Sequence, residues 1–278
     1  MGKHIMKTYD NGDFETIEDE RSYYEHIDDY NEWFTWYHDV EHSRFNHTDT
    51  TVDCIMLTYD RSEQDVAKRL KVLLIQRWTQ PFMNTWCLPG TFMNTSDKDA
   101  VATIARMLAS RLNFDVSGAK VMQLKTFTGC KRDPRGQVIS ISYLVFIHDG
   151  VKAVHNADIN GKQGLKWVPL IQAADMSNLG FDHAAQLNEA IIRLQNQFAW
   201  QPNVFMSLPV EFTIDDAIAI KCSLFADDDY ENKMLAGKAK DNFKKKYKKL
   251  FREIGVIDNG NPLSPKLYAL KNSNNLTL

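Results

Sequence analysis

The sequence predicts an α+β protein built of two successive parts, a sheet flanked by helices and a smaller helical part that ends in a β-hairpin. Apolar strand-like runs recur between residues 52 and 169, and an apolar helical pattern follows the stretch 86–90. A lysine-rich helical pattern at 238–254 precedes two short apolar runs that flank Asn259-Gly260, a hairpin signal. The chain has 278 residues, enough for one large domain or two ordinary ones.

The composition is that of a globular protein in a reducing compartment. Hydrophobic residues make up 44% and charged residues 25% of the chain, as is usual for such proteins. No apolar run approaches the roughly 18 residues that span a membrane, and the acidic N-terminal stretch is unlike a signal peptide. The cysteines show no C-x-x-C pair, so we expect free thiols, mostly buried, in a cytoplasmic protein. They are Cys54, Cys87, Cys130 and Cys222.

Residues 1–50 form an acidic extension, with thirteen Asp or Glu against four Lys or Arg. Between Ser22 and Val40, aromatic and apolar residues recur every three or four positions. This spacing predicts an amphipathic helix that buries one face on the body of the protein or on a second subunit. His38 and His42 lie one helical turn apart, but no third metal ligand accompanies them, so a solvated face is the simpler interpretation. The stripe consists of Tyr23, Ile27, Tyr30, Phe34 and Tyr37.

Five segments after residue 50 have the apolar pattern of β-strands. They are Val52–Tyr59, Lys71–Arg77, Val121–Phe127, Gln137–His148 and Lys166–Pro169. A polar hairpin loop, Asp60–Arg69, joins the first two strands, and the Pro and Gly of Lys131–Gly136 predict a turn.

A helix is predicted from Phe181 to Phe198, because its apolar residues keep helical spacing. Asp182 is its natural N-cap, which explains the residue more simply than an acid/base pair with His183. We interpret this helix as the join between two domains.

The stretch Trp86–Phe114 organises the first part of the chain. It begins with a strand end and a tight Pro89-Gly90 turn, and a short loop then leads into a helix. Either Ser96 or Asp97 can cap this helix. Its apolar face consists of Val101, Ile104, Ala105, Leu108 and Leu112.

The order W-x-L-P-G, loop and helix resembles the Nudix fold, whose signature is G-x5-E-x7-R-E-U-x-E-E-x-G-U with U aliphatic. Arg106 falls on the motif arginine, Leu108 on the aliphatic position and Phe114 on the last position. The loop is one residue longer than the pattern, so the first motif glutamate falls on Lys98 or Asp97. The resemblance implies an α/β/α sandwich with a mixed sheet.

The residues that would hold a metal do not match this signature. Where Nudix enzymes carry the glutamates that bind Mg²⁺, the chain has Met107, Ser110 and Arg111, and Asn113 replaces the later glycine. Magnesium needs hard oxygen ligands, which a thioether and a guanidinium do not supply. We therefore predict no catalytic residues, no metal site and no cofactor. Mg²⁺ enters only if the chain is a hydrolase.

A second resemblance concerns the ligand. The order Q-R-x-x-x-P-F-x-x-x-W-x-L-P-G, followed by T-F…R-D-P-R-G…S-x-x-Y, is similar to Nudix proteins of the ADP-ribose group. Guanidinium groups are well suited to bind phosphate oxygens. The arginines of the turn can equally be solvated, and the motif arginine, Arg106, can instead stabilise the signature segment through ion pairs. The predicted ligand contacts are Arg77, Trp86, Arg106, Arg132 and Arg135.

The second part begins near Met206. Thr213 caps a first helix, and the acidic loop Asp227–Asp229 lacks the glycine and glutamate of a calcium loop. A basic helix over Lys238–Ile254 follows, with Phe243, Tyr247, Leu250 or Phe251, and Ile254 as its buried stripe. Predicted strands at Val256–Asp258 and Lys266–Leu270 complete the order of a winged helix-turn-helix.

The basic helix is the predicted DNA contact. A lysine run is often only a solvated face, but this run lies on one helix of an otherwise acidic protein and a wing follows it. Lysines mostly supply sequence-independent attraction to phosphate, and Asn242 and the exposed lysines near the helix start are the better candidates to read base edges. The predicted contacts are Lys238, Lys240, Asn242, Lys244, Lys245 and Lys248.

Taken together, the chain resembles the Nudix-related transcriptional regulators, in which a weakened Nudix domain precedes a winged helix. The resemblance implies an effector domain at 51–205 and a DNA-binding domain at 206–278, and the acidic N-terminal extension at 1–50 is a departure from this family. It also implies a homodimer that binds double-stranded DNA and senses a phosphorylated or nucleotide-sugar metabolite such as ADP-ribose. The alternative is a Nudix, MutT-like hydrolase of a nucleoside diphosphate derivative.

Overall fold

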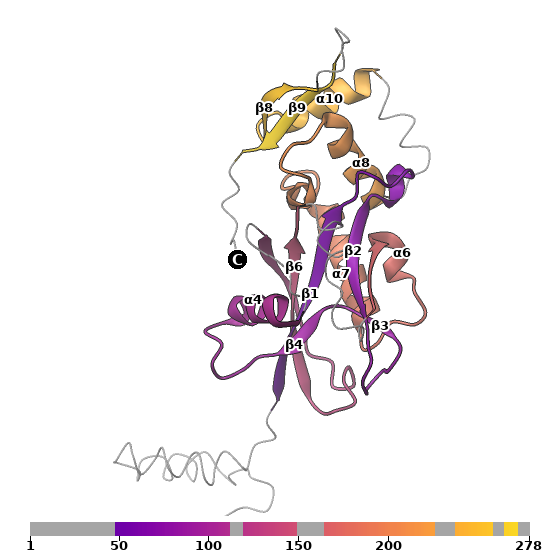
Figure 1. Ribbon diagram of the computed structural model, residues 1–278, viewed down its shortest axis with the longest axis vertical. Coiled ribbons are helices and arrows are strands. Elements are labelled where there is room, and N and C mark those ends of the chain that lie inside the picture. The colour runs from indigo at the N-terminus through magenta and orange to yellow at the C-terminus, as the bar shows by residue number, and fades with distance from the viewer. Residues whose placement is uncertain (1–47, 112–118, 149–163, 226–236, 258–263, 272–278) are drawn as a thin grey trace, which may run out of the picture. The chain divides into compact units, whose positions relative to one another are not determined.

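The computed structural model describes residues 48–111, 119–148, 164–225, 237–257 and 264–271 (Figure 1). The chain divides into two compact units, Met1–Thr48 and Asp49–Leu278, and the fold below is that of the second unit. Several predicted features lie outside the described residues. They are the amphipathic helix with its two histidines, the end of the Nudix signature after Arg111, the acidic loop at 227–229 and the Asn259-Gly260 turn.

The predicted mixed sheet is confirmed. Its seven strands run in the order β3-β2-β1-β6-β5, with β4 paired to β1 and β7 paired to β2. Strand β1 is parallel to β6, whereas the other pairings are antiparallel. The strands are β1 (Asp49–Tyr59), β2 (Leu70–Gln76), β3 (Trp86–Cys87), β4 (Gly90–Phe92), β5 (Lys120–Phe127), β6 (Val138–Phe146) and β7 (Leu165–Pro169).

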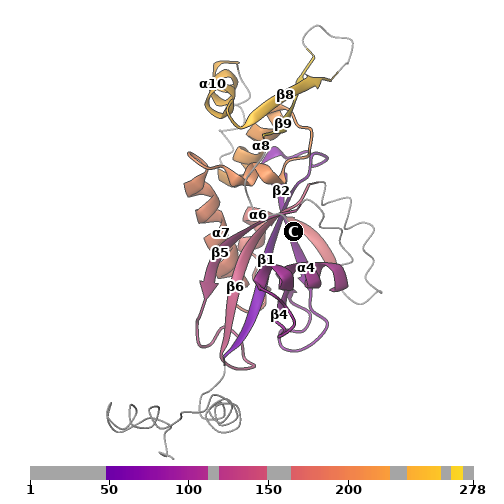
Figure 2. The ribbon, with the colours of Figure 1, turned by 90° about the vertical axis from the view of Figure 1, so that its left-hand side faces the viewer.

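Helices cover both faces of the sheet, which gives the expected α/β/α sandwich (Figures 1 and 2). Helix α4 (Ala100–Arg111) packs on one face, and α6 (Leu170–Ala174) and α7 (His183–Gln197) pack on the other. The alternation of side chains along β1 explains the two cores. Cys54 and Met56 belong to the cluster with α4, whereas Ile55 and Leu57 belong to the cluster with α7. The hairpin between β1 and β2 contains the short η2 (Val66–Lys68).

The predicted N-cap of α4 was wrong. Asp99, directly before the helix, accepts a hydrogen bond from the backbone N–H of Ala102 at 2.8 Å. Asp97 does not cap because both of its carboxylate oxygens accept from Arg106, at 2.7 and 2.6 Å. The helix therefore begins two to three residues later than either predicted cap would place it.

The C-terminal elements are η3 (Asn203–Ser207), α8 (Ile214–Phe225), α10 (Gly237–Tyr247), β8 (Phe251–Val256) and β9 (Lys266–Leu270). The predicted cap of α8 is confirmed, because Thr213 Oγ1 accepts from the backbone N–H of Asp216 at 3.2 Å. The predicted length of the basic helix was wrong, since the chain leaves the helix after Tyr247 and Phe251 starts a strand.

Packing explains where the basic helix stops. Phe251 is buried against Phe205 and Phe212, with ring centroids 5.4 and 5.1 Å apart. Continuing the helix would move Phe251 off this aromatic cluster, and Ile254, predicted to be buried, is exposed on the strand. Tertiary packing thus overrides the helical preference of the lysine run.

One hydrophobic core joins the sheet to the C-terminal elements. Phe198 at the end of α7 packs edge-on against Phe205 and Tyr247, with centroids 5.4 and 5.8 Å apart. The Tyr247 hydroxyl also donates to the backbone oxygen of Phe198 at 3.0 Å. The boundary predicted near residue 206 therefore lies inside a continuous core.

Two expectations about the chain as a whole can be compared with the described residues. Cys54, Cys87 and Cys222 are buried free thiols, as predicted, and Cys130 is an exposed one. Within the described ranges, no helix has the length and apolar character needed to cross a membrane.

Candidate functional site

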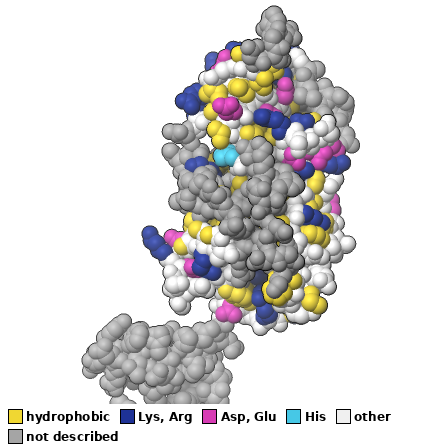
Figure 3. Space-filling model, viewed as in Figure 1, with side chains coloured by type: hydrophobic (Ala, Val, Ile, Leu, Met, Phe, Trp, Pro, Cys, Tyr) yellow, Lys and Arg dark blue, Asp and Glu magenta, His cyan; other side chains and the backbone are white. Residues whose placement is uncertain are grey.

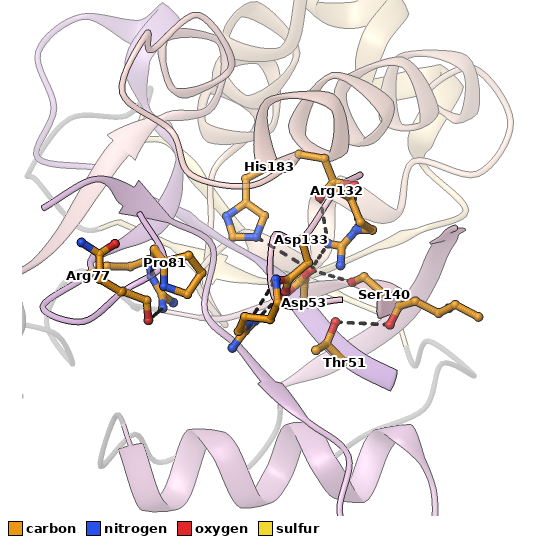
Figure 4. Close-up of polar contacts among 12 residues, drawn as sticks. Thr51, Asp53, Arg77, Pro81, Arg132, Asp133, Ser140 and His183 are labelled. Carbon is orange, nitrogen blue, oxygen red and sulfur yellow. Dashed lines mark hydrogen bonds and ion pairs between the residues drawn. The ribbon is translucent and has the colours of Figure 1, made fainter. Parts of the chain in front are cut away.

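A cavity of about 570 Å³ opens beside the N-terminal half of β1, between the loop after β2 and the turn that begins α7. Six separate segments supply its walls. Figure 4 shows the side chains of Asp53, Arg132 and His183 converging from three of them. The lining residues are Thr51, Asp53, Arg77, Trp78, Thr79, Gln80, Leu88, Gly90, Thr91, Phe92, Ser110, Arg132, Asp133, Arg135, Phe181 and His183.

Arg132 is the centre of a buried ionic network at the base of this cavity. Its Nε and Nη2 donate to the two carboxylate oxygens of Asp182 at 2.9 and 2.8 Å, and Nη2 also donates to Asp53 at 3.2 Å. Only 4% of the Arg132 side chain is exposed. The predicted solvated turn therefore does not describe Arg132, whose guanidinium is held by two carboxylates.

Neutral side chains complete the network around Asp53 and Asp182. Gln186 donates to Asp53 at 3.0 Å and to Asp182 at 2.9 Å, and its oxygen accepts from the Ser142 hydroxyl. Ser140 donates to Asp53 at 2.6 Å. These partners satisfy the carboxylate oxygens, because a buried ion pair needs hydrogen bonds as well as a counter-charge.

The interpretation of Asp182 as a helix cap was wrong. Asp182 stands at the N-cap position of α7 but makes no capping hydrogen bond with its side chain. Its carboxylate turns instead toward Arg132 and Gln186. Burial alone would raise the pKa of Asp182, and the bonds from Arg132 and Gln186 outweigh this effect and lower the pKa below its usual value.

His183 is buried as a neutral imidazole. Its Nδ1 accepts the backbone N–H of Leu88 at 2.9 Å, which places the ring proton on Nε2, and Nε2 lies 3.8 Å from Asp53. Burial lowers the pKa of His183 and outweighs the raising effect of the nearby carboxylates. The residue therefore positions β3 and the Pro89-Gly90 turn, and no acid/base pair with Asp182 forms.

Gly90 allows Asp53 to approach the turn closely. A Cβ atom at position 90 would lie 2.2 Å from Asp53 Oδ1 and 3.1 Å from the backbone oxygen of Val52. Any larger residue would push the Asp53 carboxylate away from its partners.

Arg77 and Arg135 also line the cavity, and both of their guanidinium groups contact the Phe181 ring. The guanidinium carbons of Arg77 and Arg135 lie 5.0 and 5.5 Å from the centre of the Phe181 ring. Arg135 also lies 4.6 Å from the Phe92 ring and donates to both oxygens of Asp133, at 2.9 and 2.6 Å. The structure therefore brings Arg77, Arg132 and Arg135, three of the predicted ligand contacts, to one cavity.

The remaining predicted ligand contacts are not among the lining residues. Arg106 braces the loop before α4, because it donates to both Asp97 oxygens and to the backbone oxygen of Phe92 at 2.9 Å. These bonds lower the pKa of Asp97 well below its usual range. Trp86 lies under the ammonium group of Lys166, 3.9 Å from its nitrogen.

The lysines of α10 form a second feature, at the far end of the described residues from β4 (Figure 1). In Figure 3, dark-blue Lys and Arg side chains border the upper part of the molecule, where α10 and the β8–β9 hairpin lie. Lys238, Asn242 and Lys245 are exposed. Lys248 is exposed as well, in the turn that follows the helix.

Two predicted DNA contacts already have partners within the protein. Lys240 forms an ion pair with Asp215 of α8 at 2.6 Å. The Lys244 ammonium lies 5.6 Å from the centre of the Tyr268 ring on β9. These two side chains help to fix α10 against its neighbours.

No protein-family model matches the chain. A relative from Acinetobacter baylyi, described as the ADPR responsive transcriptional repressor NtrR, is 30% identical over 167 residues. The match covers 60% of this chain and 62% of that relative, so it spans less than two thirds of the relative's length.

Solved structures match over a larger share of the chain. A MutT/nudix family protein from Enterococcus faecalis has a TM-score of 0.69 and 27% identity, with 93% of this chain and all of that chain covered. NrtR from Shewanella oneidensis has a TM-score of 0.64 and 26% identity, with 80% of this chain and 94% of that chain covered. The chain is therefore similar in sequence and fold to Nudix-related transcriptional regulators.

The residues at the positions of the Nudix metal-binding glutamates do not fit a magnesium ion. Met107 is buried in the core beneath α4, and the Ser110 hydroxyl donates to the backbone oxygen of Arg106 at 2.7 Å. Among the described residues, no group of three or more His, Cys, Asp or Glu side chains is placed to hold a metal.

The sequence patterns did not single out Asp53, Gln186 and Phe181 as site residues. Asp53 lies in an apolar strand, where a lone carboxylate is a signal of a buried polar role. Phe181 has a φ of 56°, in the left-handed region that larger residues seldom adopt. Its neighbour Gly180 explains the turn, because a Cβ there would meet Cys87 and Thr85 at 2.8 and 2.9 Å.

Proposed function

We propose that this protein is a transcriptional regulator whose Nudix-like part binds a nucleotide- or sugar-type effector such as ADP-ribose, and whose winged helix binds operator DNA. The observation that carries the proposal is that a cavity walled by guanidinium groups and an exposed lysine-rich helix belong to one continuous core. The relative from Acinetobacter baylyi is described as responsive to ADPR, which supports this choice of effector.

The cavity favours an anionic ligand with polar and flat parts. Arg77 and Arg135 offer guanidinium groups at the wall, and such groups bind phosphate oxygens through paired hydrogen bonds. Trp78, an exposed ring at the cavity, offers a flat apolar surface for a base. Arg132 plays a different part, because its buried guanidinium is committed to Asp53 and Asp182.

The winged part favours double-stranded DNA. The NrtR protein of Shewanella oneidensis has been solved in complex with a 27mer DNA, and this chain matches that structure with a TM-score of 0.64 and 25% identity. We propose a homodimer in the cytoplasm, because two such helices would occupy half-sites about one helical turn of DNA apart.

We further propose that the protein does not hydrolyse its effector. Helix α4 carries the buried Met107 thioether and the hydrogen-bonded Ser110 hydroxyl at positions where a Mg²⁺ site would need carboxylates. The hydrolase alternative predicts turnover on the order of 1 s⁻¹ or faster with ADP-ribose and Mg²⁺ or Mn²⁺. Turnover at this rate would support the hydrolase alternative and contradict the regulator proposal.

Fluorescence anisotropy tests the regulator directly. The full chain is titrated onto labelled duplex fragments of its own genome at several salt concentrations, with and without ADP-ribose. We expect binding of a subset of fragments, a steep fall with salt, and a change in affinity when ADP-ribose is added. Equal, weak binding to all fragments by the wild type and by a Lys245→Ala/Lys248→Ala variant would refute the DNA-binding role.

A further inference from the structure

The carboxylate of Asp216, near the start of α8, is a buried meeting point of the two parts of the fold. It accepts from the Tyr59 hydroxyl at 3.0 Å and from Arg61 at 3.2 and 2.7 Å, both in the β1–β2 hairpin. It also accepts from the backbone N–H and the hydroxyl of Thr213, at 2.8 and 2.9 Å. Asp216 is 5% exposed and its bond to Tyr59 is buried, whereas the Arg61 side chain is half exposed.

Helix α8 is attached to the same hairpin at a second point. Ser223 accepts the backbone N–H of Leu70 at 3.2 Å and lies 2.7 Å from the backbone oxygen of Val66. Ser223 follows Asp216 by seven residues, which is about two helical turns, so both side chains lie on one face of the helix. The hairpin therefore holds α8 along this face.

Strand β1 connects this attachment to the cavity. Asp53 and Tyr59 are six residues apart on the strand and share one of its faces, since side chains alternate. At about 3.3 Å per residue the two positions lie about 20 Å apart. Asp53 belongs to the cavity network and Tyr59 to the attachment of α8, so one rigid strand touches both.

The neighbouring residue carries the connection onward to the basic helix. Asp215 forms the ion pair with Lys240 of α10, and β9 meets the segment before α8 through the bridge between Phe212 and Tyr268. The two consecutive aspartates therefore have different partners. Asp216 bonds to Tyr59 of strand β1, whereas Asp215 bonds to Lys240 of α10.

We infer that Asp216 is a positioning residue that fixes α8, and with it α10 and the β8–β9 hairpin, relative to strand β1, and so couples effector binding to DNA binding. The coupling half of this inference rests on the proposed function. The positioning half does not, because it concerns only the geometry of the chain itself.

The positioning half is tested by the distance between two spin labels in the full chain. One label sits on the exposed Cys130 and the other on a Lys245→Cys variant, while the three buried cysteines remain unlabelled. We expect a narrow distance distribution in the otherwise wild-type chain and a broad one after Asp216→Asn. An equally narrow distribution in Asp216→Asn would overturn the inference.

Two further variants make this comparison specific. Glu63→Gln is the matched control, because Glu63 lies in the same hairpin and its carboxylate accepts from Lys71 and from the Asp65 backbone N–H, not from α8. It should leave the distribution narrow. Tyr59→Phe removes a single hydroxyl and should broaden the distribution even if Asp216→Asn fails to fold.

The coupling half is tested by anisotropy with a DNA fragment that the wild type binds. The ratio of DNA affinities without and with saturating ADP-ribose measures the coupling, and factors of about 5 to 150 are typical. Asp216→Asn should bring this ratio close to 1 while the ADP-ribose affinity in calorimetry stays within about twofold. An unchanged ratio refutes the coupling role, whereas a wild type that ignores ADP-ribose refutes the proposed effector instead.

Discussion

Arg132 and Asp182, 50 residues apart in the sequence, form an ion pair through two hydrogen bonds of 2.9 and 2.8 Å. The same guanidinium reaches Asp53, so the turn that carries Arg132 is fixed to β1 and to the start of α7 at once. Arg135, three residues later, pairs only with Asp133 of its own turn. The two arginines of one short motif therefore have different roles, one inside the fold and one at the cavity wall.

We expect Arg132→Ala to lower the free energy of unfolding by about 3–5 kcal/mol, because it leaves the buried Asp53 and the partly buried Asp182 without their counter-charge. Arg135→Ala should cost less than Arg132→Ala, because 40% of the Arg135 side chain is exposed and its single carboxylate partner, Asp133, keeps the backbone N–H of residue 135. Urea unfolding followed by circular dichroism measures both. Equal losses for the two variants would contradict the assignment of Arg132 to the buried network.

The neutral state of His183 predicts a pH dependence. Burial holds the folded-state pKa of His183 below the ordinary value of 6.5, so only the unfolded chain takes up a proton as the pH falls through that value. The stability associated with neutral His183 is therefore present above about pH 6.5 and is lost as pH falls toward the folded pKa, by up to about 1.4 kcal/mol per pH unit. Asp182, whose pKa is lowered from 3.8, acts only at lower pH.

His183→Asn provides the comparison for that pH dependence. The amide oxygen of Asn can keep accepting the Leu88 N–H that His183 Nδ1 accepts, but Asn does not titrate. We expect the variant to be less stable at neutral pH and to lose less stability than the wild type between about pH 7 and pH 5.5. Parallel stability curves for the two proteins would show that His183 titrates normally.

Phe181 should set the affinity for an anionic effector. Phe181→Leu removes the ring that holds Arg77 and Arg135, and a cation–π contact is worth about 1 kcal/mol, so we expect about fivefold weaker ADP-ribose binding. Phe181→Tyr keeps the ring and should bind normally. Trp200→Leu, which removes an exposed ring that does not line the cavity, is the control. Calorimetry giving one affinity for all these variants would place the anion elsewhere.

The lysines of α10 should contribute unequally to DNA binding. Lys245→Ala removes an exposed ammonium group and should flatten the slope of log affinity against log salt by about 0.9 if it contacts one phosphate. Lys240→Ala should change the slope less, because Asp215 already neutralises that lysine. Anisotropy over a series of salt concentrations separates the two. A larger effect of Lys240→Ala would mean that the ion pair opens on DNA.

Local patterns predicted most of the secondary structure. The apolar alternation of 52–59 and 71–77 and the helical spacing after Asp99 are signals carried by neighbouring residues, so the strands and α4 could be found from them. The end of the basic helix could not. The lysine run favours helix beyond Tyr247, and only the aromatic cluster around Phe251 decides in favour of strand.

The site was predicted in part for the same reason. The sequence placed arginines in a turn and after a strand, and Arg77, Arg132 and Arg135 do meet at one cavity. The sequence could not show that Arg132 is buried while Arg135 lies at the cavity wall. That difference depends on Asp182, which comes within reach of Arg132 only because α7 packs on the sheet.

By itself, the sequence determined the sheet, the helix α4 that lacks the metal-binding carboxylates of the Nudix signature, and the basic helix of the C-terminal part. These follow from side-chain periodicity and from the residue types at a few motif positions. Only the tertiary structure decided that Asp53, Arg132 and Asp182 share one buried network, and that Asp216 joins α8 to the β1–β2 hairpin. The physical reason is that a buried charge is stable only beside a partner, and the partners come from segments 50 to 157 residues away.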